Sequence, residues 1–313
     1  MAGTSETGAL PVLDSRTVAL TRSPDRAGSM LHTLKATGAR MVLVPVIDFE
    51  LPEDTGAFDD AVRRLSADGF DWLVVTSITT VRALAQRCAE LDVAMADLVP
   101  EGTAVAAVGD TTRAALEAEG IAVSLVPGME RSGAGLLQVW PAGARHASVL
   151  LPQADIADPA LGEGLRQLGA AVVGVTAYRT VAYPADPARR LDQALSMVSG
   201  PGVADGAAGA GVAAGADPAG STRDVPVWTP AEFGTRAHSG GVDALVLTSP
   251  SAARRIVEEC PRLDPRVRVV AIGRPTAREA ERCGLATAAT APEPSGAGIA
   301  AALNQVLSPG PGS

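Results

Sequence analysis

The 313-residue chain is poor in aromatic residues, in cysteine and in positive charge. Aromatic residues make up only 3% of it, so its core must consist mainly of Ala, Val and Leu, the usual filling between helices and a parallel sheet. The net charge of −9 argues against nucleic acid or an anionic membrane as a partner, because either would need a basic face. An anionic small molecule needs only a local basic rim and is compatible with this charge.

The sequence also lacks the patterns of metal, disulfide and nucleotide sites. Its three cysteines and three histidines are widely scattered, so we expect neither a disulfide framework nor a metal site. The segments 133–135 and 296–298 lack the third glycine of a dinucleotide fingerprint, and no P-loop is present. The sequence shows no Ser/His/Asp or Cys/His arrangement that would indicate covalent catalysis.

No apolar run approaches the roughly 18 residues of a membrane span. The first ten residues lack the basic and apolar regions of a secretory signal, so we expect a cytoplasmic protein. Residues 1–13 and 308–313 are expected to be disordered tails.

Short apolar runs alternate with helical patterns along the chain. Residues 17–22 predict a strand, Ser23-Pro24 is typical of a helix start, and residues 41–49 predict the next strand. The order of strand, polar turn and helix recurs at 71–77 and at 104–112. This alternation predicts an α/β fold with parallel sheets, in which ligands bind at the carboxyl ends of the strands.

The two halves of the chain resemble each other. Four pairs of segments match in the same order: 34–39 with 165–170, 71–77 with 243–249, 107–112 with 271–276, and 132–135 with 295–298. Together with the chain length, this repeat predicts two domains. Residues 199–225, almost all Gly, Ala, Pro and Asp, are expected to form a flexible insertion, with order returning at 226–235.

Hydroxyl residues and glycine follow several predicted strands. These candidate binding residues are Thr76, Ser77, Gly109, Thr112, Thr248, Ser249 and Thr276. Such hydroxyls cap helices as readily as they bind ligands, but the adjoining helix N-termini favour anions. Arg22 and Arg179 also follow or end strands, and a guanidinium can hold a carboxylate with two hydrogen bonds. The turns therefore predict a site for an anionic ligand.

Both tyrosines of the chain lie in residues 172–184, between the two halves. The β-branched residues and the closing Pro184 of this segment predict an extended strand. We expect the segment to cross between the domains, with Tyr178 facing the binding cleft and Tyr183 pointing elsewhere.

In their order and spacing, these motifs resemble the uroporphyrinogen-III synthase family. The resemblance covers about residues 18–307 apart from the insertion, and it rests on Leu20 to Arg22, Asp71 to Ser77, Val108 to Thr112, Ala177 to Thr180, Leu247 to Pro250 and Ile272 to Ala277. It implies two doubly wound parallel-sheet domains joined by a two-stranded β connection, 44–50 outward and 176–183 returning. One discontinuous domain would comprise 14–46 and 182–313, and the other 47–181.

The resemblance implies a lyase of haem biosynthesis that needs no cofactor. Its substrate would be the linear tetrapyrrole hydroxymethylbilane, closed with loss of water and inversion of the last ring. The family's binding-cleft tyrosine falls on Tyr178, the candidate catalytic residue, which either assists departure of the hydroxyl group or only binds the substrate. Two binding hydroxyls fall on Thr112 and Thr276. Pro275 stands where some members have a further threonine, so the role of that hydroxyl does not transfer.

Two other classes of protein fit a two-domain chain. A non-catalytic binding or sensor protein for an anionic small molecule would close on its ligand in the same way, but the chain shows neither a signal sequence nor a basic DNA-binding segment. A sugar-nucleotide transferase would need the missing phosphate loop. No long apolar surface stretch indicates an oligomer, so a monomer is expected.

Overall fold

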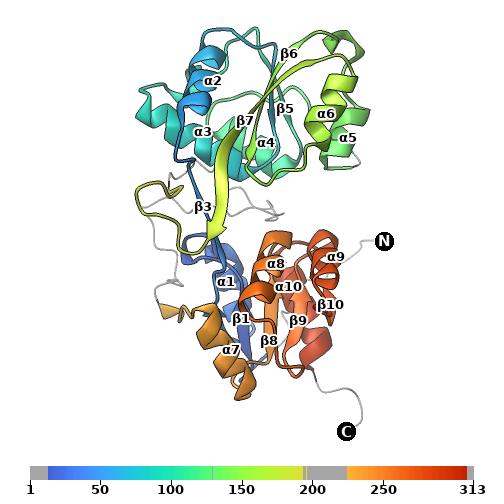
Figure 1. Cartoon of the computed structure of the whole chain (residues 1–313). Coiled ribbons are helices and arrows are strands. Elements are labelled where there is room, and N and C mark those ends of the chain that lie inside the picture. Colours follow the sequence, from blue (N-terminus) through green and yellow to red (C-terminus); the bar gives the residue numbers. More distant parts are fainter. Residues whose placement is uncertain (1–12, 129, 193–194, 196–223, 309–313) are drawn as a thin grey trace, which may run out of the picture. The chain divides into compact units, whose positions relative to one another are not determined.

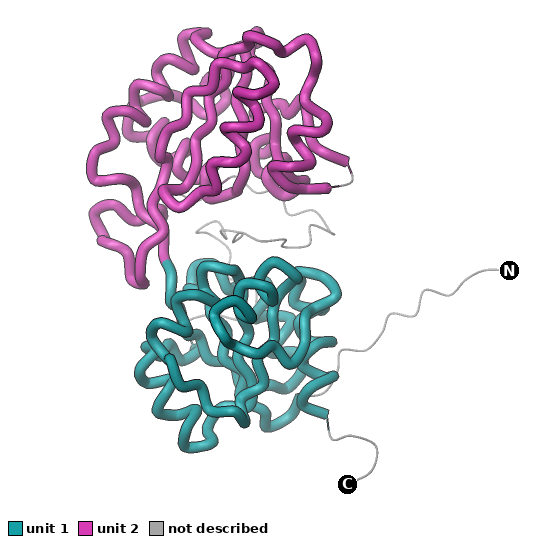
Figure 2. Tube along the Cα trace, turned by 45° about the vertical axis from the view of Figure 1, so that its right-hand side comes forward, with its two compact units in different colours: residues 1–47, 204–207, 217–313 teal, residues 48–203, 208–216 magenta. Residues whose placement is uncertain are grey.

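The computed structural model describes residues 13–128, 130–192, 195 and 224–308 (Figure 1). They form two compact units: unit 1 holds the described residues up to Ile47 and from Asp224 onward, and unit 2 holds those from Asp48 to Leu195 (Figure 2). Residues 1–12 and 309–313 of the expected tails, and 199–223 of the expected insertion, lie outside the described residues.

Unit 1 contains one five-stranded parallel sheet with the order β10-β9-β8-β1-β2. Its strands are β1 (Thr17–Leu20), β2 (Arg40–Leu43), β8 (Ala244–Leu247), β9 (Arg268–Ala271) and β10 (Ala289–Thr290). Side chains alternate between its faces, so Val18 and Leu20 enter one hydrophobic cluster and Ala19 enters the other. The sheet is therefore buried on both sides, as parallel sheets are.

Helices cover both faces of this sheet (Figure 1). One face carries α1 (Gly28–Lys35) and α10 (Gly296–Leu307), and the other carries α7 (Pro230–His238), α8 (Pro250–Glu259) and α9 (Arg274–Arg282). A 3-10 turn, Pro24–Arg26, precedes α1. Leu13, expected in a tail, instead packs in the first cluster, because its backbone N–H donates to the Thr37 carbonyl and its side chain is buried.

Unit 2 contains a second five-stranded sheet with the order β3-β7-β6-β4-β5. Its strands are β3 (Ile47–Glu50), β4 (Trp72–Val75), β5 (Ala104–Ala107), β6 (Ser148–Ala154) and β7 (Ala171–Ala182). The four strands from β4 to β7 run parallel, so their carboxyl ends meet at one edge. The expected α/β architecture with two parallel sheets is confirmed.

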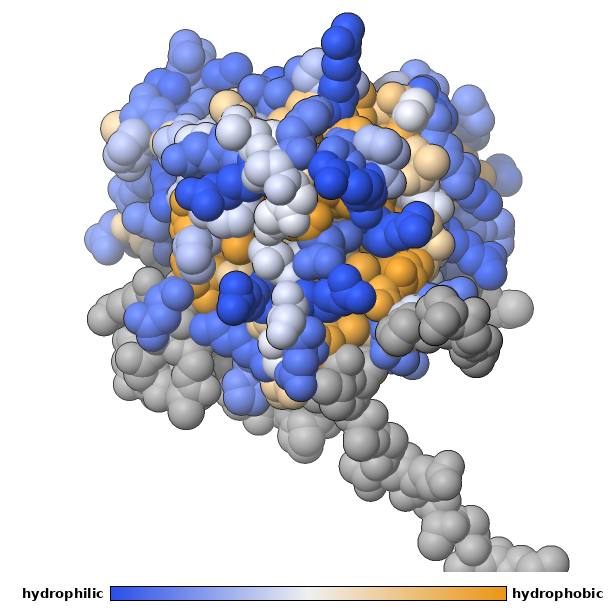
Figure 3. Space-filling model, turned by 90° about the horizontal axis from the view of Figure 1, so that it is seen from below, coloured by the Kyte–Doolittle hydropathy of each residue, from blue (hydrophilic) through white to orange (hydrophobic). Residues whose placement is uncertain are grey.

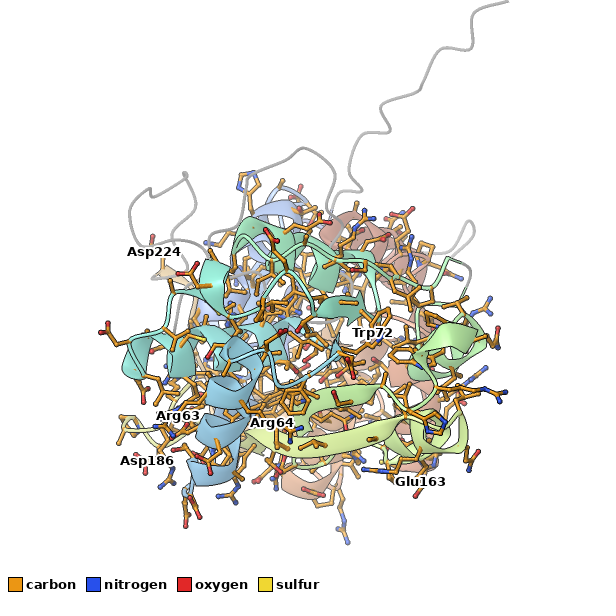
Figure 4. All side chains as sticks on the ribbon, turned by 90° about the horizontal axis from the view of Figure 1, so that it is seen from above. Arg63, Arg64, Trp72, Glu163, Asp186 and Asp224 are labelled. Carbon is orange, nitrogen blue, oxygen red and sulfur yellow. The ribbon has the colours of Figure 1, made fainter. Side chains whose placement is uncertain are left out.

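The helices of unit 2 also cover two faces. One face carries α2 (Gly56–Ser66), α3 (Ile78–Glu90) and α4 (Asp110–Ala118), and the other carries α5 (Gly133–Gln138) and α6 (Ala160–Gln167). Figure 4 shows Arg63 and Arg64 extending from α2 and Glu163 extending from α6. Two 3-10 turns, Met95–Asp97 and Ala142–Ala144, complete the unit. None of the helices described in either unit has the length and apolar character needed to cross a membrane.

The connection between the units differs in detail from the expected strands. Strand β3 begins at Ile47 rather than at Val44, because the backbone N–H of Val44 still donates to Leu20 in unit 1. Strand β7 spans Ala171–Ala182, close to the extended strand expected over 172–184, and the returning strand expected at 176–183 is its later part, because Ala171 to Val175 pair with β6. The two connecting strands are neighbours in the sheet of unit 2.

Residues 182–192 were assigned to the first domain from the sequence, but in the structure they belong to unit 2. They lie along β3, where Leu51 N–H donates to the Arg189 carbonyl and Leu191 N–H donates to the Phe49 carbonyl. Leu191 is also buried in the core of unit 2. The chain is described again from Asp224, and Trp228 N–H donates to the Leu43 carbonyl, so the expected return of order at 226–235 is confirmed.

Candidate functional site

At the carboxyl edge of unit 2, Ser77 is the N-cap of α3. Thr76 and Ser77 follow β4, and the Ser77 hydroxyl accepts a hydrogen bond from the Thr80 backbone N–H at 3.1 Å. The same oxygen lies 3.0 Å from the Thr80 hydroxyl and 3.2 Å from the Tyr178 hydroxyl. A cap of this kind satisfies one of the free N–H groups at a helix start, where the positive end of the helix dipole also lies.

Tyr178 was expected to face the binding cleft, but its ring is buried. Its side chain is only 8% exposed and belongs to the core of unit 2. The ring packs edge-on against Phe49, with the centroids 5.5 Å apart. The prediction that Tyr178 faces the binding cleft is therefore wrong for the ring, because burying this large apolar surface is favourable and β3 supplies an aromatic partner. The Tyr178 hydroxyl lies 3.2 Å from the hydroxyl of Ser77, which follows β4.

The second turn of unit 2 follows β5. Gly109 is the N-cap of α4, and a Cβ placed on it would meet no atom within 4 Å, so the backbone is open on that side. Thr112 lies in the first turn of α4 and is buried. Asp110, beside Gly109, forms an ion pair of 2.5 Å with Arg131. Unlike Ser77, Gly109 therefore provides no side-chain cap for its helix.

Arg179 is held by carboxylates of unit 2. Its guanidinium lies 3.6 Å from the buried Glu50 and 3.6 Å from the exposed Glu53. Arg189 approaches the same two carboxylates at 3.5 and 3.8 Å. A substrate carboxylate on Arg179 would have to compete with these existing partners.

In unit 1, the candidate residues lie where β1 and β8 are neighbours. This is the point at which the strand order reverses, and ligands of doubly wound sheets bind at such points. Thr248 N–H donates to the Thr21 hydroxyl at 3.1 Å, and the Thr248 hydroxyl donates to the Thr21 carbonyl at 2.8 Å. The hydroxyl of Thr248 thus joins two strands.

The remaining candidates of unit 1 surround the same edge. Ser249 is the N-cap of α8 and accepts from Ala252 N–H at 3.1 Å. Arg22, two residues beyond β1, is buried. Thr276 lies in the first turn of α9, is 2% exposed and follows Pro275. Their position at the carboxyl ends of β1, β8 and β9 agrees with the expectation from the sequence.

The structure brings the candidates together in two groups. Ser77, which follows Thr76 in the chain, meets Tyr178 in unit 2, and the turns after β1 and β8 meet in unit 1. Sequence reasoning missed Thr80 and Thr21, which hold Ser77 and Thr248. The signal for Thr80 was its position three residues after a capping serine. Nothing in the local sequence of Thr21 separates it from other threonines.

Unit 2 also has a cavity of about 240 Å³ that no motif indicated. It lies between the end of β6, the middle of β7 and α6, and Gln153, Arg166 and Thr176 contribute its polar side chains. The Arg166 guanidinium donates to the Val172 carbonyl at 3.3 Å. Within the described ranges, no group of three or more His, Cys, Asp or Glu side chains could hold a metal ion.

The comparisons with known proteins agree on one family. The family described as uroporphyrinogen-III synthase HemD matches residues 29–201 and 222–301. A uroporphyrinogen-III synthase of Synechococcus elongatus is 28% identical over 169 residues, which cover 54% of this chain and 62% of that protein. The chain thus matches about three fifths of the length of this relative.

Solved structures show the same fold. A mutant uroporphyrinogen III synthase of Thermus thermophilus is 19% identical and has a TM-score of 0.59, covering 94% of this chain and 99% of its own. A uroporphyrinogen-III synthetase of Helicobacter pylori is 14% identical and has a TM-score of 0.51, covering 93% and 99%.

Proposed function

This chain belongs to the uroporphyrinogen-III synthase family, and we propose that it closes hydroxymethylbilane into uroporphyrinogen III. The family consists of lyase-class enzymes of haem biosynthesis. In the proposed reaction, the linear tetrapyrrole loses water and its last ring is inverted. We propose that no cofactor takes part.

One observation of the structure supports this proposal most directly. In each unit, a serine-capped helix begins at the carboxyl end of a central strand: Ser77 starts α3 and Ser249 starts α8, both with a cap distance of 3.1 Å. The substrate carries many acetate and propionate arms, and helix N-termini attract such anions through free N–H groups and the helix dipole. A duplicated set of these termini suits a large polyanionic substrate.

Six residues supply the proposed contacts to the substrate arms. They are Arg22, Thr76, Gly109, Thr112, Ser249 and Thr276. Thr248 contributes mainly by joining β1 to β8, since its hydroxyl already donates to Thr21. Arg179 is a weaker contact than the sequence indicates, because Glu50 and Glu53 hold it.

Much of the proposed catalysis is positioning. The uncatalysed ring closure gives the uninverted isomer, so the enzyme must hold a folded conformer of the chain in which the last ring can invert. The proposed acid is Tyr178, whose hydroxyl would assist departure of the substrate hydroxyl group as water. Its buried ring and its contact with Phe49 keep that hydroxyl in one place.

We also propose that the protein acts as a cytoplasmic monomer. Figure 3 shows one face of the molecule, on which hydrophobic residues are interspersed with hydrophilic ones. On this face, the mixture is compatible with a monomer, because no partner is needed there to cover a continuous apolar surface.

The product isomer tests the proposed reaction. The purified protein is incubated with freshly generated hydroxymethylbilane, and the porphyrinogen isomers are separated after oxidation. We expect the inverted type III isomer. Formation of the type I isomer alone, at the uncatalysed rate, would refute the proposed synthase activity. It would favour a non-catalytic binding protein for an anionic molecule.

A substitution at Tyr178 tests the proposed acid. Tyr178→Phe should reduce the single-turnover rate on the order of a hundredfold to ten-thousandfold, the range of general acid catalysis. The matched control is Tyr183→Phe, at the other tyrosine of the chain, which should keep nearly the full rate. A loss of tenfold or less at Tyr178 equals one ordinary hydrogen bond and would contradict the acid role.

A further inference from the structure

The Ser77 hydroxyl lies at a junction of three polar groups. It accepts from the Thr80 backbone N–H, and the hydroxyls of Thr80 and Tyr178 lie 3.0 and 3.2 Å away. A serine hydroxyl has one proton to donate and two lone pairs to accept. Because the Thr80 N–H uses one lone pair, the hydroxyl can still turn between accepting from Tyr178 and donating to it.

We propose that Ser77 is a positioning residue for the Tyr178 hydroxyl and stabilises the phenolate that forms when Tyr178 gives up its proton. The inference rests on the proposed function, in which Tyr178 is the acid. It gives Ser77 a role through Tyr178, whereas the sequence indicated a helix cap or direct contact with substrate. The start of α3 adds to the effect, since its positive dipole end lies beside the same oxygen.

The protons of this step balance without any further reactant. The O–H bond of Tyr178 breaks, its proton passes to the departing hydroxyl group of the substrate, and that group leaves as water. The Ser77 hydroxyl then donates to the phenolate while its oxygen continues to accept from Thr80 N–H. When the ring closes, the pyrrole carbon that forms the new bond loses a proton, which returns to the phenolate.

Charged groups near Tyr178 remain constant in the test. The buried charged side chains on the elements packed against it are Asp48 and Glu50 on β3, Asp59 on α2, and Arg82 and Arg87 on α3. The more exposed Asp155 and Arg179 lie beside it, and Asp155 N–H donates to the Tyr178 carbonyl. A substitution at Ser77 alters none of these charged groups, so a change in the pKa of Tyr178 reports on the loss of the Ser77 hydroxyl.

The small number of tyrosines permits a direct measurement. In a Tyr183→Phe background, Tyr178 is the only tyrosine of the chain, and its titration can be followed by NMR with ¹³C at the phenolic carbon. Ser77→Ala should raise the pKa of Tyr178 by about one unit, because a hydrogen bond to the charged form is lost. Ser77→Thr, which keeps a hydroxyl, should restore the parent value.

A second helix cap provides the matched control. Ser295 caps α10 and accepts from Gly298 N–H at 3.1 Å, the same distance as at Ser77, but it belongs to unit 1, whereas both tyrosines belong to unit 2. Ser295→Ala should leave the titration of Tyr178 unchanged. If Ser77→Ala folds poorly, Ser77→Gly removes the hydroxyl with little loss of helix capping and should give the same shift.

The pH dependence of turnover links the contact to the reaction. In Ser77→Ala, the decrease of kcat at alkaline pH should shift to higher pH by the same amount as the pKa of Tyr178. The value of kcat should fall roughly tenfold, and KM should change much less. If Ser77→Ala leaves the pKa of Tyr178 unchanged and still makes the type III isomer, the positioning role is overturned and the proposed function stays intact. If the pKa of Tyr178 rises in Ser77→Ala but the parent protein makes no type III isomer, the contact is supported and the proposed function is refuted.

Discussion

Replacing Thr21 by valine should lower the stability of unit 1 without changing the size of any side chain in its core. Thr21 is buried between β1 and β8, and its hydroxyl accepts from Thr248 N–H at 3.1 Å. It also donates to the Val246 carbonyl at 3.0 Å. Valine has the same shape but has no hydroxyl to accept or donate a hydrogen bond, so the buried Thr248 N–H would lose this acceptor.

The magnitude follows from these two hydrogen bonds. Loss of the acceptor for a buried N–H costs about 1 to 3 kcal/mol. The bond to Val246 adds less, because the Thr21 backbone N–H also donates to that carbonyl at 3.0 Å. We therefore expect Thr21→Val to reduce the free energy of unfolding of unit 1 by about 2 kcal/mol. At usual denaturant slopes, this shifts the urea midpoint by about 1 M.

The assay uses a probe that belongs to unit 1 alone. A chain with two units need not unfold in one step, so the signal must come from the unit that is changed. Trp228 packs against the core of unit 1, and the other two tryptophans, Trp72 and Trp140, lie in unit 2. In a Trp72→Phe/Trp140→Phe background, tryptophan fluorescence in urea reports on Trp228 only.

A second threonine of the same unit is the matched control. Thr235 on α7 donates its hydroxyl to the Ala231 carbonyl at 3.0 Å but is exposed, so Thr235→Val should change stability by no more than about 0.5 kcal/mol. A midpoint for Thr21→Val within about 0.3 M of its parent, or equal to that of Thr235→Val, would refute the reasoning.

Two further predictions concern ion pairs. Asp59→Ala should destabilise unit 2 by about 3 kcal/mol, because Asp59 binds the buried Arg87 through both oxygens at 2.7 and 2.8 Å. Asp60→Ala, at an exposed pair, should cost under about 1 kcal/mol. Both are measured by urea titration in a Trp228→Phe background, in which the fluorescence of Trp72 and Trp140 reports on unit 2. Equal effects would contradict the structure. Hydrogen bonds from the Arg266 side chain and then its backbone N–H lower the pKa of Asp264 to about 2. The stabilising contribution of Asp264 should therefore be full above pH of about 4 and lost as the pH falls towards 2; a carboxyl NMR titration midpoint near 4 would contradict this.

The local elements were largely predictable because they depend on neighbouring residues. The apolar run before Thr76 formed β4, and Ser77 capped the next helix, as hydroxyls after strands often do. The repeated Ser-Gly-Ala-Gly motif is explained by the structure as a pair of helix starts, capped by Ser132 and Ser295. A Cβ on the last glycine of either motif, Gly135 or Gly298, would collide with a backbone carbonyl.

The contacts of the candidate site were much less predictable. The hydroxyls of Tyr178 and Ser77 are 101 positions apart in the sequence, and those of Thr21 and Thr248 are 227 apart. Whether such groups meet depends on strand register and on which face of the sheet a helix covers. The burial of the Tyr178 ring followed from Phe49 on β3, a strand that local patterns could place only approximately.

The sequence by itself determined two α/β halves, the alternation of strands and helices, and the turns at which polar groups gather. These properties depend on hydrophobic periodicity and on caps within a few residues. Only the tertiary structure decided which polar groups already have a hydrogen-bond or ion-pair partner within the protein. It assigned Thr248 to Thr21, Arg179 to Glu50, and the Tyr178 hydroxyl to Ser77, because the register of parallel strands brings distant residues within hydrogen-bond or ion-pair distance.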